Sequence, residues 1–447
     1  MNPGLTQAVT QPKRTLALWT LVLFGVGLMT PIIVLGTFGI LAQGSSGRAP
    51  LAYVIALAAM LPTAVSYALM ARAYPVAGSS YAYVRKAIDS RLGFLTGWAI
   101  LLDYLFMPMA IWLIGTAYLH SAIPSVPEPV WLLTFIGVTT LINIVGLKLA
   151  AGLNTVLVIL QTLVLLAFVA LAIHYALGDP TLPLFPVAPL TTSIAQAPGV
   201  LNAAAIACYS YLGFDAVSTL SEETIDPRRT VPRAIVLVTL IGGVLYIGAA
   251  YFVQVAHPAF NFADADSAAY EIARNIGGDV FVLVFLSGLV IGQFAAGMAT
   301  QASASRLLYA MGRDAVLPAT IFGYLQPRYQ TPVYSIGISA VIAFLALGID
   351  VTTSTSFINF GAFLTFIAVN LSVIFQYWRK RTQGGWKPLA LYLLLPAFGM
   401  VADFALMVSL DHKALILGLS WLTIGVGYLG YLTGGFRKPP PELHLVS

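Results

Sequence analysis

The chain has 447 residues, of which 59% are hydrophobic and only 9% are charged, and its formal net charge is +5. A soluble domain carries roughly 25% charged residues, so this composition excludes a soluble globular protein and indicates a chain that is solvated mostly by lipid. Its single cysteine, Cys208, excludes an internal disulfide and a cysteine-based metal cluster.

Apolar stretches long enough to cross a bilayer, about 20 residues each, recur along the whole sequence. The alternation typical of a β-barrel is missing, so we expect α-helices, which satisfy their backbone polar groups internally. Twelve spans are expected, near residues 16–42, 51–72, 92–120, 129–148, 151–177, 198–222, 233–256, 278–306, 332–349, 355–378, 388–409 and 414–433. The expected division of the chain is a tail over 1–15, a single membrane domain over 16–436 and a second tail over 437–447.

The basic residues predict the orientation of the chain in the membrane. If the N-terminus lies in the cytoplasm, 19 of the 22 Lys and Arg residues fall in cytoplasmic segments, because only Arg48, Arg274 and Lys413 fall outside. This bias follows the positive-inside rule and predicts that both termini are cytoplasmic. The positive net charge therefore reflects topology and does not indicate a nucleic-acid partner. No cleaved signal peptide is apparent before the first span.

Two spans contain residues that interrupt a helix. The first, "FGVGLMTPIIVLGTFG", holds Gly25, Gly27, Thr30 and Pro31, and the sixth, "CYSYLGFDAVSTLSEE", holds Gly213. These spans open two successive blocks of five, and because five is odd, the second block must lie inverted relative to the first. Broken helices at matching places in two inverted halves predict a substrate site near the bilayer midplane.

Three loop segments carry a family resemblance. They are "YPVAGSSYAYVRKAI" (74–88), "YLGFDAVSTLSEETIDPRRTVPRAI" (211–235) and "SASRLLYAMGRDAVLP" (303–318). With them, the full chain resembles the amino acid–polyamine–organocation superfamily of secondary transporters. "LLDYLFMPM" and "SFINFGAFLTF" are most similar to segments of bacterial putrescine importers.

The resemblance implies an all-helical LeuT-type fold. In that fold, helices 1 and 6 are broken and ten core helices form two inverted repeats, here about 16–177 and 198–378. Two peripheral helices, here 388–433, follow them.

Three carboxylates lie deep within predicted spans: Asp103, Asp215 and Asp403. A charge at the centre of a membrane helix is unfavourable by about 2.5–3.5 kcal/mol on insertion scales, so such residues usually face a cavity or a partner. No Lys or Arg lies near the middle of a predicted span. Our hypothesis is that Asp103 binds the ammonium group of a cationic substrate. The alternative is a protonated side chain that is hydrogen-bonded to a helix backbone.

The other acidic residues near or within spans leave more than one interpretation open. Asp215 holds a second ammonium group or carries a proton, or it caps the second half-helix, for which Asp is well suited. Asp403 lies in a peripheral span, where we expect it to pair with the backbone or a neighbouring helix. Glu222 and Glu223 either close an inner gate against Arg85, Lys86 or Arg306, or are interfacial charges in water.

The first break bears on the class of substrate. Transporters of amino acids usually have a Gly-Ser-Gly-like break whose free N–H groups receive the substrate carboxylate, but the matching residues here are Met29-Thr30-Pro31. Because Pro31 has no N–H, the sequence favours an amine without a carboxylate. Aromatic side chains suit ammonium groups and methylenes. The expected substrate residues are Asp103, Asp215, Tyr209 as a gate, Tyr104, Thr30, Phe214 and Phe360, and Trp98 and Phe363 are further aromatic candidates.

These observations predict a secondary active transporter in the cytoplasmic membrane that imports putrescine or a similar polyamine by alternating access. A proton is the expected coupling ion, with Asp215, Glu222 and Glu223 as gating or coupling residues. A sodium site that uses Ser303 is the other possibility. The rival function is an amino-acid transporter or exchanger of the same fold, for a cationic amino acid or γ-aminobutyrate. We expect no enzyme activity, catalytic residue, cofactor or metal site, because no motif for one is present.

Overall fold

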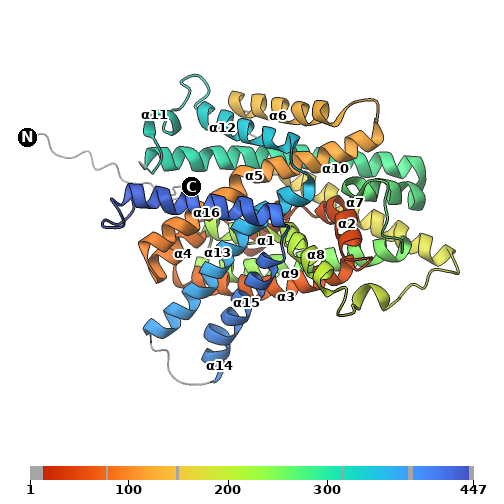
Figure 1. Ribbon diagram of the computed structural model, residues 1–447, viewed down its shortest axis with the longest axis horizontal. Helices are drawn as coiled ribbons and strands as arrows, with labels where there is room; N and C mark the ends of the chain where they lie inside the picture. The colour runs from red at the N-terminus through yellow and green to blue at the C-terminus, as the bar shows by residue number, and fades with distance from the viewer. Residues whose placement is uncertain (1–13, 77–78, 147–150, 315, 381–385, 442–447) are drawn as a thin grey trace, which may run out of the picture.

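The computed structural model describes residues 14–76, 79–146, 151–314, 316–380 and 386–441 (Figure 1). Within these ranges the chain is helical and contains no strand. The first half contains α1 (Leu18–Leu28), α2 (Ile33–Gly44), α3 (Ala49–Ala73), α4 (Ser79–Ala87), α5 (Ser90–Ala122), α6 (Glu128–Val145) and α7 (Ala151–Gly178). The helical prediction is therefore confirmed.

The second half repeats this order of long helices and adds a peripheral pair. Its elements are η1 (Ala188–Leu190), α8 (Ala197–Ala207), η2 (Cys208–Tyr211), η3 (Asp215–Glu222), α9 (Pro227–Ala256), η4 (Ala265–Ser267), α10 (Ala268–Arg313), α11 (Ala319–Phe322), α12 (Val333–Ala343), η5 (Phe344–Leu347), α13 (Val351–Lys380), α14 (Trp386–Leu389), the π-helical turn η6 (Ala390–Leu394), α15 (Leu395–Val408) and α16 (His412–Leu432). A non-helical Gly278, with φ 66°, separates a short surface helix from the long span within α10.

Ten of the described helices are long and apolar enough to cross a membrane, and α1 and α2, bent by 46° at their break, make one further span when they are counted together. Val333–Leu347 is a shorter apolar helix at the position of the ninth expected span, so the count of twelve spans stays a prediction. Local sequence signals mark several helix ends. Asp89 accepts a hydrogen bond from the backbone N–H of Arg91 in α5, and Asp411 accepts from those of Lys413 and Ala414 in α16, as N-cap residues do. Gly146 ends α6 in the left-handed conformation.

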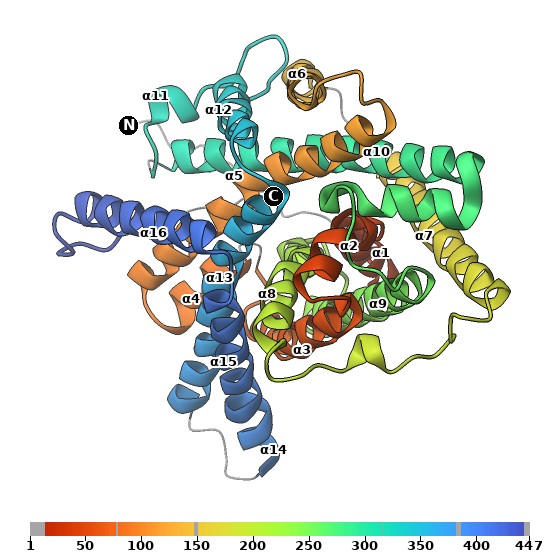
Figure 2. The same cartoon turned by 45° about the vertical axis from the view of Figure 1, so that its right-hand side comes forward.

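The helices form two packed groups, and the broken spans belong to one of them. α3 packs along α9, and α5 packs along both α10 and α13. Figure 2 shows α1, α2, α3, α8 and α9 gathered together, with α5, α10, α6 and α12 on the other side. α14, α15 and α16 lie at the periphery, where α15 and α16 contact α13. This arrangement places the first and sixth spans in the interior.

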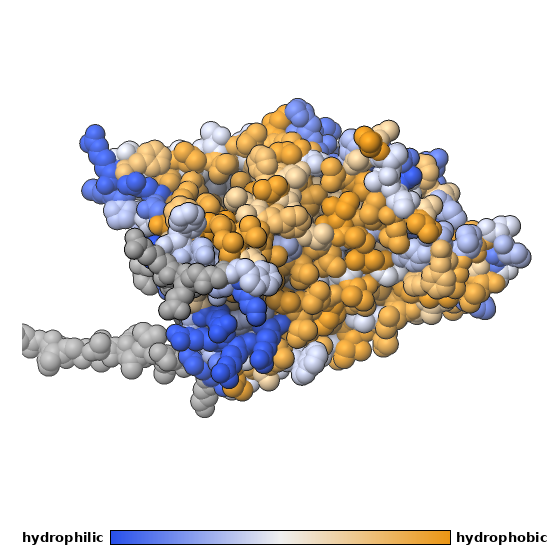
Figure 3. All heavy atoms as spheres, turned by 90° about the horizontal axis from the view of Figure 1, so that it is seen from below, coloured by the Kyte–Doolittle hydropathy of each residue, from blue (hydrophilic) through white to orange (hydrophobic). Residues whose placement is uncertain are grey.

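The outer surface of the bundle is apolar, as lipid contact requires. Figure 3 shows hydrophobic residues over the middle of the molecule and hydrophilic residues toward its ends. Peripheral helices supply much of this apolar surface, through exposed side chains such as Leu141, Val156, Leu163, Val401, Phe404, Leu419 and Ile424. Glycines let aromatic rings approach neighbouring helices closely, and Gly297 of α10 lies against the Trp112 ring of α5.

Candidate functional site: two broken spans and a pair of carboxylates

The first span breaks at the residues that the sequence predicts. α1 ends at Leu28 and α2 begins at Ile33, and Thr30 between them has φ 49°. Pro31 cannot donate a backbone hydrogen bond, so the helical ladder is interrupted here. The hydroxyl of Tyr246 on α9 donates to the carbonyl of Met29 at 2.7 Å. A tyrosine from another helix thus satisfies one carbonyl that the break releases.

The sixth span breaks at Gly213, between η2 and η3. Gly213 has φ 115°, a conformation that side chains with a Cβ adopt only with strain. A Cβ at this position would lie 2.8 Å from the Cβ of Leu28 and 3.3 Å from the backbone nitrogen of Met29. Glycine is therefore needed both for the turn and for the contact between the two breaks. The predicted breaks in the first and sixth spans are confirmed, and the structure places the two breaks in contact.

Asp215 lies at the start of η3, directly after this break. Its Oδ1 accepts a hydrogen bond from the backbone N–H of Gly213 at 3.3 Å. Asp215 lies in the first turn of η3, where negative charge is favoured by the helix dipole. The N-cap residue of η3 is Phe214, and no side chain caps that helix, so the predicted capping of the second half-helix is not seen. The transport role of Asp215 stays a prediction, and it is compatible with the bond to Gly213, because the second carboxylate oxygen is not used in this bond.

Asp103 lies in the middle of α5, and one of its oxygens lacks a partner. Its Oδ1 is buried without a hydrogen bond, which is unfavourable for a carboxyl group. Asp215 lies close enough to interact electrostatically with Asp103, and no Lys, Arg or His among the described residues offsets their charges. Two carboxylates therefore share one region of the interior without a counter-ion.

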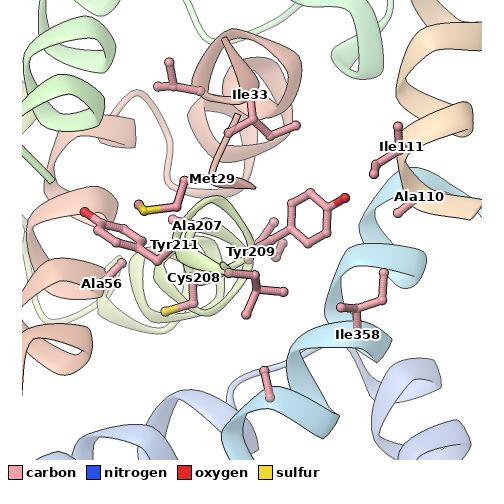
Figure 4. Close-up of a cluster of buried hydrophobic side chains, with 14 of the residues drawn as sticks. Met29, Ile33, Ala56, Ala110, Ile111, Ala207, Cys208, Tyr209, Tyr211 and Ile358 are labelled. Atoms are coloured by element: carbon pink, nitrogen blue, oxygen red, sulfur yellow. The ribbon is translucent and has the colours of Figure 1, made fainter. Parts of the chain in front are cut away.

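Two tyrosines complete this region. Tyr104 interacts electrostatically with both carboxylates, and Tyr209 interacts with Asp103. Figure 4 shows the Tyr209 ring extending from η2 toward Ala110 and Ile111 of α5. This placement suits the predicted gate.

Phe214 packs on the side of the sixth break that faces α3 and α13. Its ring makes an edge contact with Tyr67 at 5.6 Å between centroids and a tilted contact with Phe366 at 5.4 Å. Phe214 therefore belongs to a buried aromatic group next to the break, and its ring contacts other rings on two sides.

Two predicted aromatic residues lie elsewhere. The Trp98 ring stacks on Trp421 of α16 at 5.0 Å, and each indole N–H donates to the backbone carbonyl of the other tryptophan at 3.0 Å. Trp98 precedes Asp103 by five residues, which places it about 140° away around the helix. Phe360 lies against Gly418 of the same peripheral helix. We therefore do not carry these two side chains into the proposed site.

The segment around Glu222 and Glu223 contacts the start of the chain. The backbone carbonyl of Glu223 accepts hydrogen bonds from the N–H groups of Thr15 at 2.8 Å and Leu16 at 3.0 Å, and Ile225 donates to the carbonyl of Leu16 at 3.0 Å. A short parallel bridge thus joins the residues before α1 to the residues after η3. The pairing of the two glutamate carboxylates with basic residues stays a prediction.

Asp403 pairs with neighbouring helices, as expected for a peripheral span. Its Oδ2 accepts from the Thr63 hydroxyl of α3 at 2.8 Å and from the Asn370 amide of α13 at 3.0 Å. Sequence reasoning missed both partners and also Tyr246. A polar side chain within an apolar span was the feature of the sequence that could have indicated such a partner.

Among the described residues, no group of His, Cys, Asp or Glu could hold a metal ion.

Comparison with known proteins places this helical bundle, with its two broken spans, in a class. The model of the amino acid permease family matches residues 20–410. The chain therefore belongs to the amino acid permease family of the amino acid–polyamine–organocation superfamily, whose members are transporters and not enzymes.

Three relatives show where the chain lies within this family. It is 39% identical over 438 residues to the low-affinity putrescine importer PlaP of Escherichia coli (strain K12), covering 97% of each chain. It is 40% identical over 190 residues to a probable low-affinity putrescine importer PlaP of Klebsiella pneumoniae, covering 42% of this chain and 95% of that protein. It is 27% identical over 447 residues to the branched-chain amino acid permease BcaP of Bacillus subtilis, covering 95% and 91%.

Proposed function

We propose that this transporter imports putrescine, or a similar small polyamine, across the cytoplasmic membrane by alternating access and in symport with protons. The substrate class is inferred mainly from the buried Oδ1 of Asp103, which has no hydrogen-bond partner. Asp103 lies close enough to Asp215 to interact with it electrostatically, and no cation among the described residues offsets their charges. The similarity to putrescine importers over nearly the whole chain supports the same substrate.

The chemistry of putrescine matches this arrangement. The molecule has an ammonium group at each end of a four-carbon chain and no carboxylate, so it presents two positive charges to two carboxylates. In our proposal Asp103 binds one ammonium group and Asp215 binds the other. Tyr104, Tyr209 and Phe214 supply aromatic surface for the ammonium groups and methylenes. Thr30 lies at the first break, where Pro31 offers no N–H group to a substrate carboxylate.

The proposed transport cycle uses the two broken spans. With both termini in the cytoplasm, as the basic residues predict, substrate enters past Tyr209 and neutralises the carboxylates. The half-helices on the side of the termini then move and open a path to the cytoplasm. In this proposal Glu222 and Glu223 belong to the gate on that side.

Uptake of labelled putrescine into proteoliposomes tests the substrate and its anchor, with wild type compared with Asp103→Asn. Truncating one member of a desolvated charge pair costs about 2–5 kcal/mol in binding, so we expect KM to rise at least about 30-fold. Asp279→Asn is the matched control, because it neutralises a carboxylate whose side chain is 84% exposed, and it should transport like wild type. Unchanged uptake by Asp103→Asn would refute the anchor.

Competition separates the second candidate function. The similarity to a branched-chain amino acid permease gives an amino acid as the rival substrate. An excess of another diamine should inhibit putrescine uptake better than lysine or γ-aminobutyrate does. If lysine or γ-aminobutyrate competes better, the family assignment stands but the substrate is an amino acid, and Asp103 is then better explained as a proton site.

The coupling ion needs a separate measurement, in which the membrane potential is clamped. A potential of 100 mV supplies about 2.3 kcal/mol per elementary charge, so a divalent substrate is driven inward by the potential alone. With the potential held at zero and sodium omitted, an imposed pH gradient that is acidic outside should accelerate uptake. Acceleration by sodium and not by the pH gradient would refute proton coupling.

A further inference from the structure

A fully buried carboxyl group lies outside the proposed substrate site. Asp403 of α15 has no exposed surface, and its Oδ2 holds together three helices through Thr63 of α3 and Asn370 of α13. The Asn370 amide also donates to the Thr63 hydroxyl at 2.8 Å, which leaves the hydroxyl proton free to bond the carboxyl. We call Asp403, Thr63 and Asn370 the buried trio.

The buried trio has more acceptor oxygens than are needed to hold the three helices together. All the bonds between these side chains go to one carboxyl oxygen or to the Thr63 hydroxyl. Oδ1 of Asp403 is buried without a partner, and so is the amide oxygen of Asn370. Each orphan of this kind is unfavourable by about 1–3 kcal/mol, and by more for a charged group. A side chain with a single acceptor oxygen would be enough to hold the three helices together. A group that binds and releases a proton also needs an oxygen that is not already hydrogen-bonded.

The buried trio adjoins the sixth break through Tyr67. This residue follows Thr63 by four positions on α3, so it lies on the same face of the helix. Its buried ring contacts Phe214, and its hydroxyl interacts electrostatically with both Asp215 and Asp403. A change of charge at Asp403 therefore alters the electrostatic environment of Tyr67, which also interacts with the proposed substrate carboxylate Asp215.

Few other titratable groups face Asp403. Tyr67 from α3 and Cys208 from η2 are the groups in the described chain that interact electrostatically with it. α13 contributes the neutral Asn370. No Lys, Arg or His among the described residues lies near enough to hold Asp403 as a permanent ion pair.

Symport requires the proton and the substrate to be bound at the same time. A proton on Asp103 or Asp215 removes the negative charge that an ammonium group needs, so proton and substrate would exclude each other there. Mutually exclusive binding yields exchange of the two ligands, not their joint movement. A symporter of a diamine therefore needs a titratable group other than these two carboxylates. Asp403 is the remaining acidic residue of the described chain that lies well inside a span.

We propose that Asp403 binds the coupling proton while Asp103 and Asp215 bind the two ammonium groups. This inference rests on the proposed proton-coupled import. One proton adds to Oδ1 of Asp403 when the site is open to the outside, and the same proton leaves to the cytoplasm when the site is open there. No other bond is made or broken. Oδ2 remains an acceptor for Thr63 and Asn370 in both forms, so the buried trio keeps its geometry.

Asp403→Asn in proteoliposomes tests the proposal, with the membrane potential clamped. An asparagine keeps an acceptor for Thr63 but cannot titrate. We expect putrescine counterflow to be retained and the response to the pH gradient to be lost. For one proton per substrate, a gradient of about two pH units drives about 100-fold accumulation in wild type, whereas Asp403→Asn should only equilibrate putrescine. Gradient-driven accumulation by Asp403→Asn overturns the proposal.

Thr63→Val is the matched control, because it removes the two hydrogen bonds of the Thr63 hydroxyl and leaves the carboxyl group in place. It should still respond to the gradient, and a loss equal to that of Asp403→Asn would make the buried trio a structural clamp and overturn the proposal. If Asp403→Asn shows no counterflow, Asp403→Glu decides: it should stay gradient-driven with a shifted pH midpoint, and an unchanged midpoint overturns the proposal. A wild type that ignores the gradient refutes the proposed coupling itself, and this inference with it.

Discussion

Replacing Gly213 by alanine tests whether the two breaks must touch through a residue without a Cβ. The added carbon would lie 2.8 Å from the Cβ of Leu28, whereas carbon atoms attract one another best at about 3.5–4.0 Å. The two breaks would therefore have to separate by about 1 Å. Strain at φ 115° adds to this clash. Strained backbone conformations cost about 1–3 kcal/mol, and overpacking costs about 1–3 kcal/mol.

The sum predicts a destabilisation of about 2–6 kcal/mol for Gly213→Ala, which is a large part of the stability of most proteins. Thermal unfolding of the purified protein in detergent measures it. Gly248→Ala is the control, because Gly248 lies within α9 and a Cβ there has no neighbour within 4 Å. It should unfold like wild type or slightly later, since alanine favours a helix. If both variants unfold at the same temperature, the inference that the breaks require glycine is wrong.

Two further predictions concern regions away from the carboxylates. Trp98→Phe and Trp421→Phe should each destabilise the protein by about 1–2 kcal/mol, because each removes one hydrogen bond and part of the stack. Their double mutant should lose less than the sum, and strict additivity in thermal unfolding would refute the pairing. Burial against Phe262 lowers the pKa of His257. The unfolded chain therefore binds a proton first as pH falls below about 6.5, so stability should decline toward pH 5. His257→Gln should flatten that decline, and an unchanged pH dependence of unfolding would contradict it.

Local signals in the sequence predicted the spans and their interruptions. The first span was expected over 16–42 and is observed over Leu18–Gly44, and its break falls at Met29-Thr30-Pro31 as expected. Proline and glycine change the backbone conformation within one or two residues, so their effect can be predicted from the sequence without knowledge of the fold. The odd number of spans in each block predicts that the second block is inverted relative to the first, whereas the contact between the two breaks is seen only in the structure.

Contacts between distant segments could not be predicted in the same way. Thr63 and Asp403 are 340 residues apart, and no local pattern relates them. The faces of membrane helices are also hard to assign, because a span such as α5 is apolar on all sides and has no polar stripe to orient it. Trp98 was placed near Asp103 by proximity in sequence alone, and helical geometry turns it toward α16 instead.

The bridge between Leu16 and Thr224 has a mechanical consequence. It fastens the start of α1 to the segment after η3, and the contact between Gly213 and Leu28 joins the same two half-helices at their other ends. Two helices that are in contact at both ends cannot move independently without breaking one of these contacts. We therefore expect α1 and η3 to move together when the transporter opens toward the face of the termini.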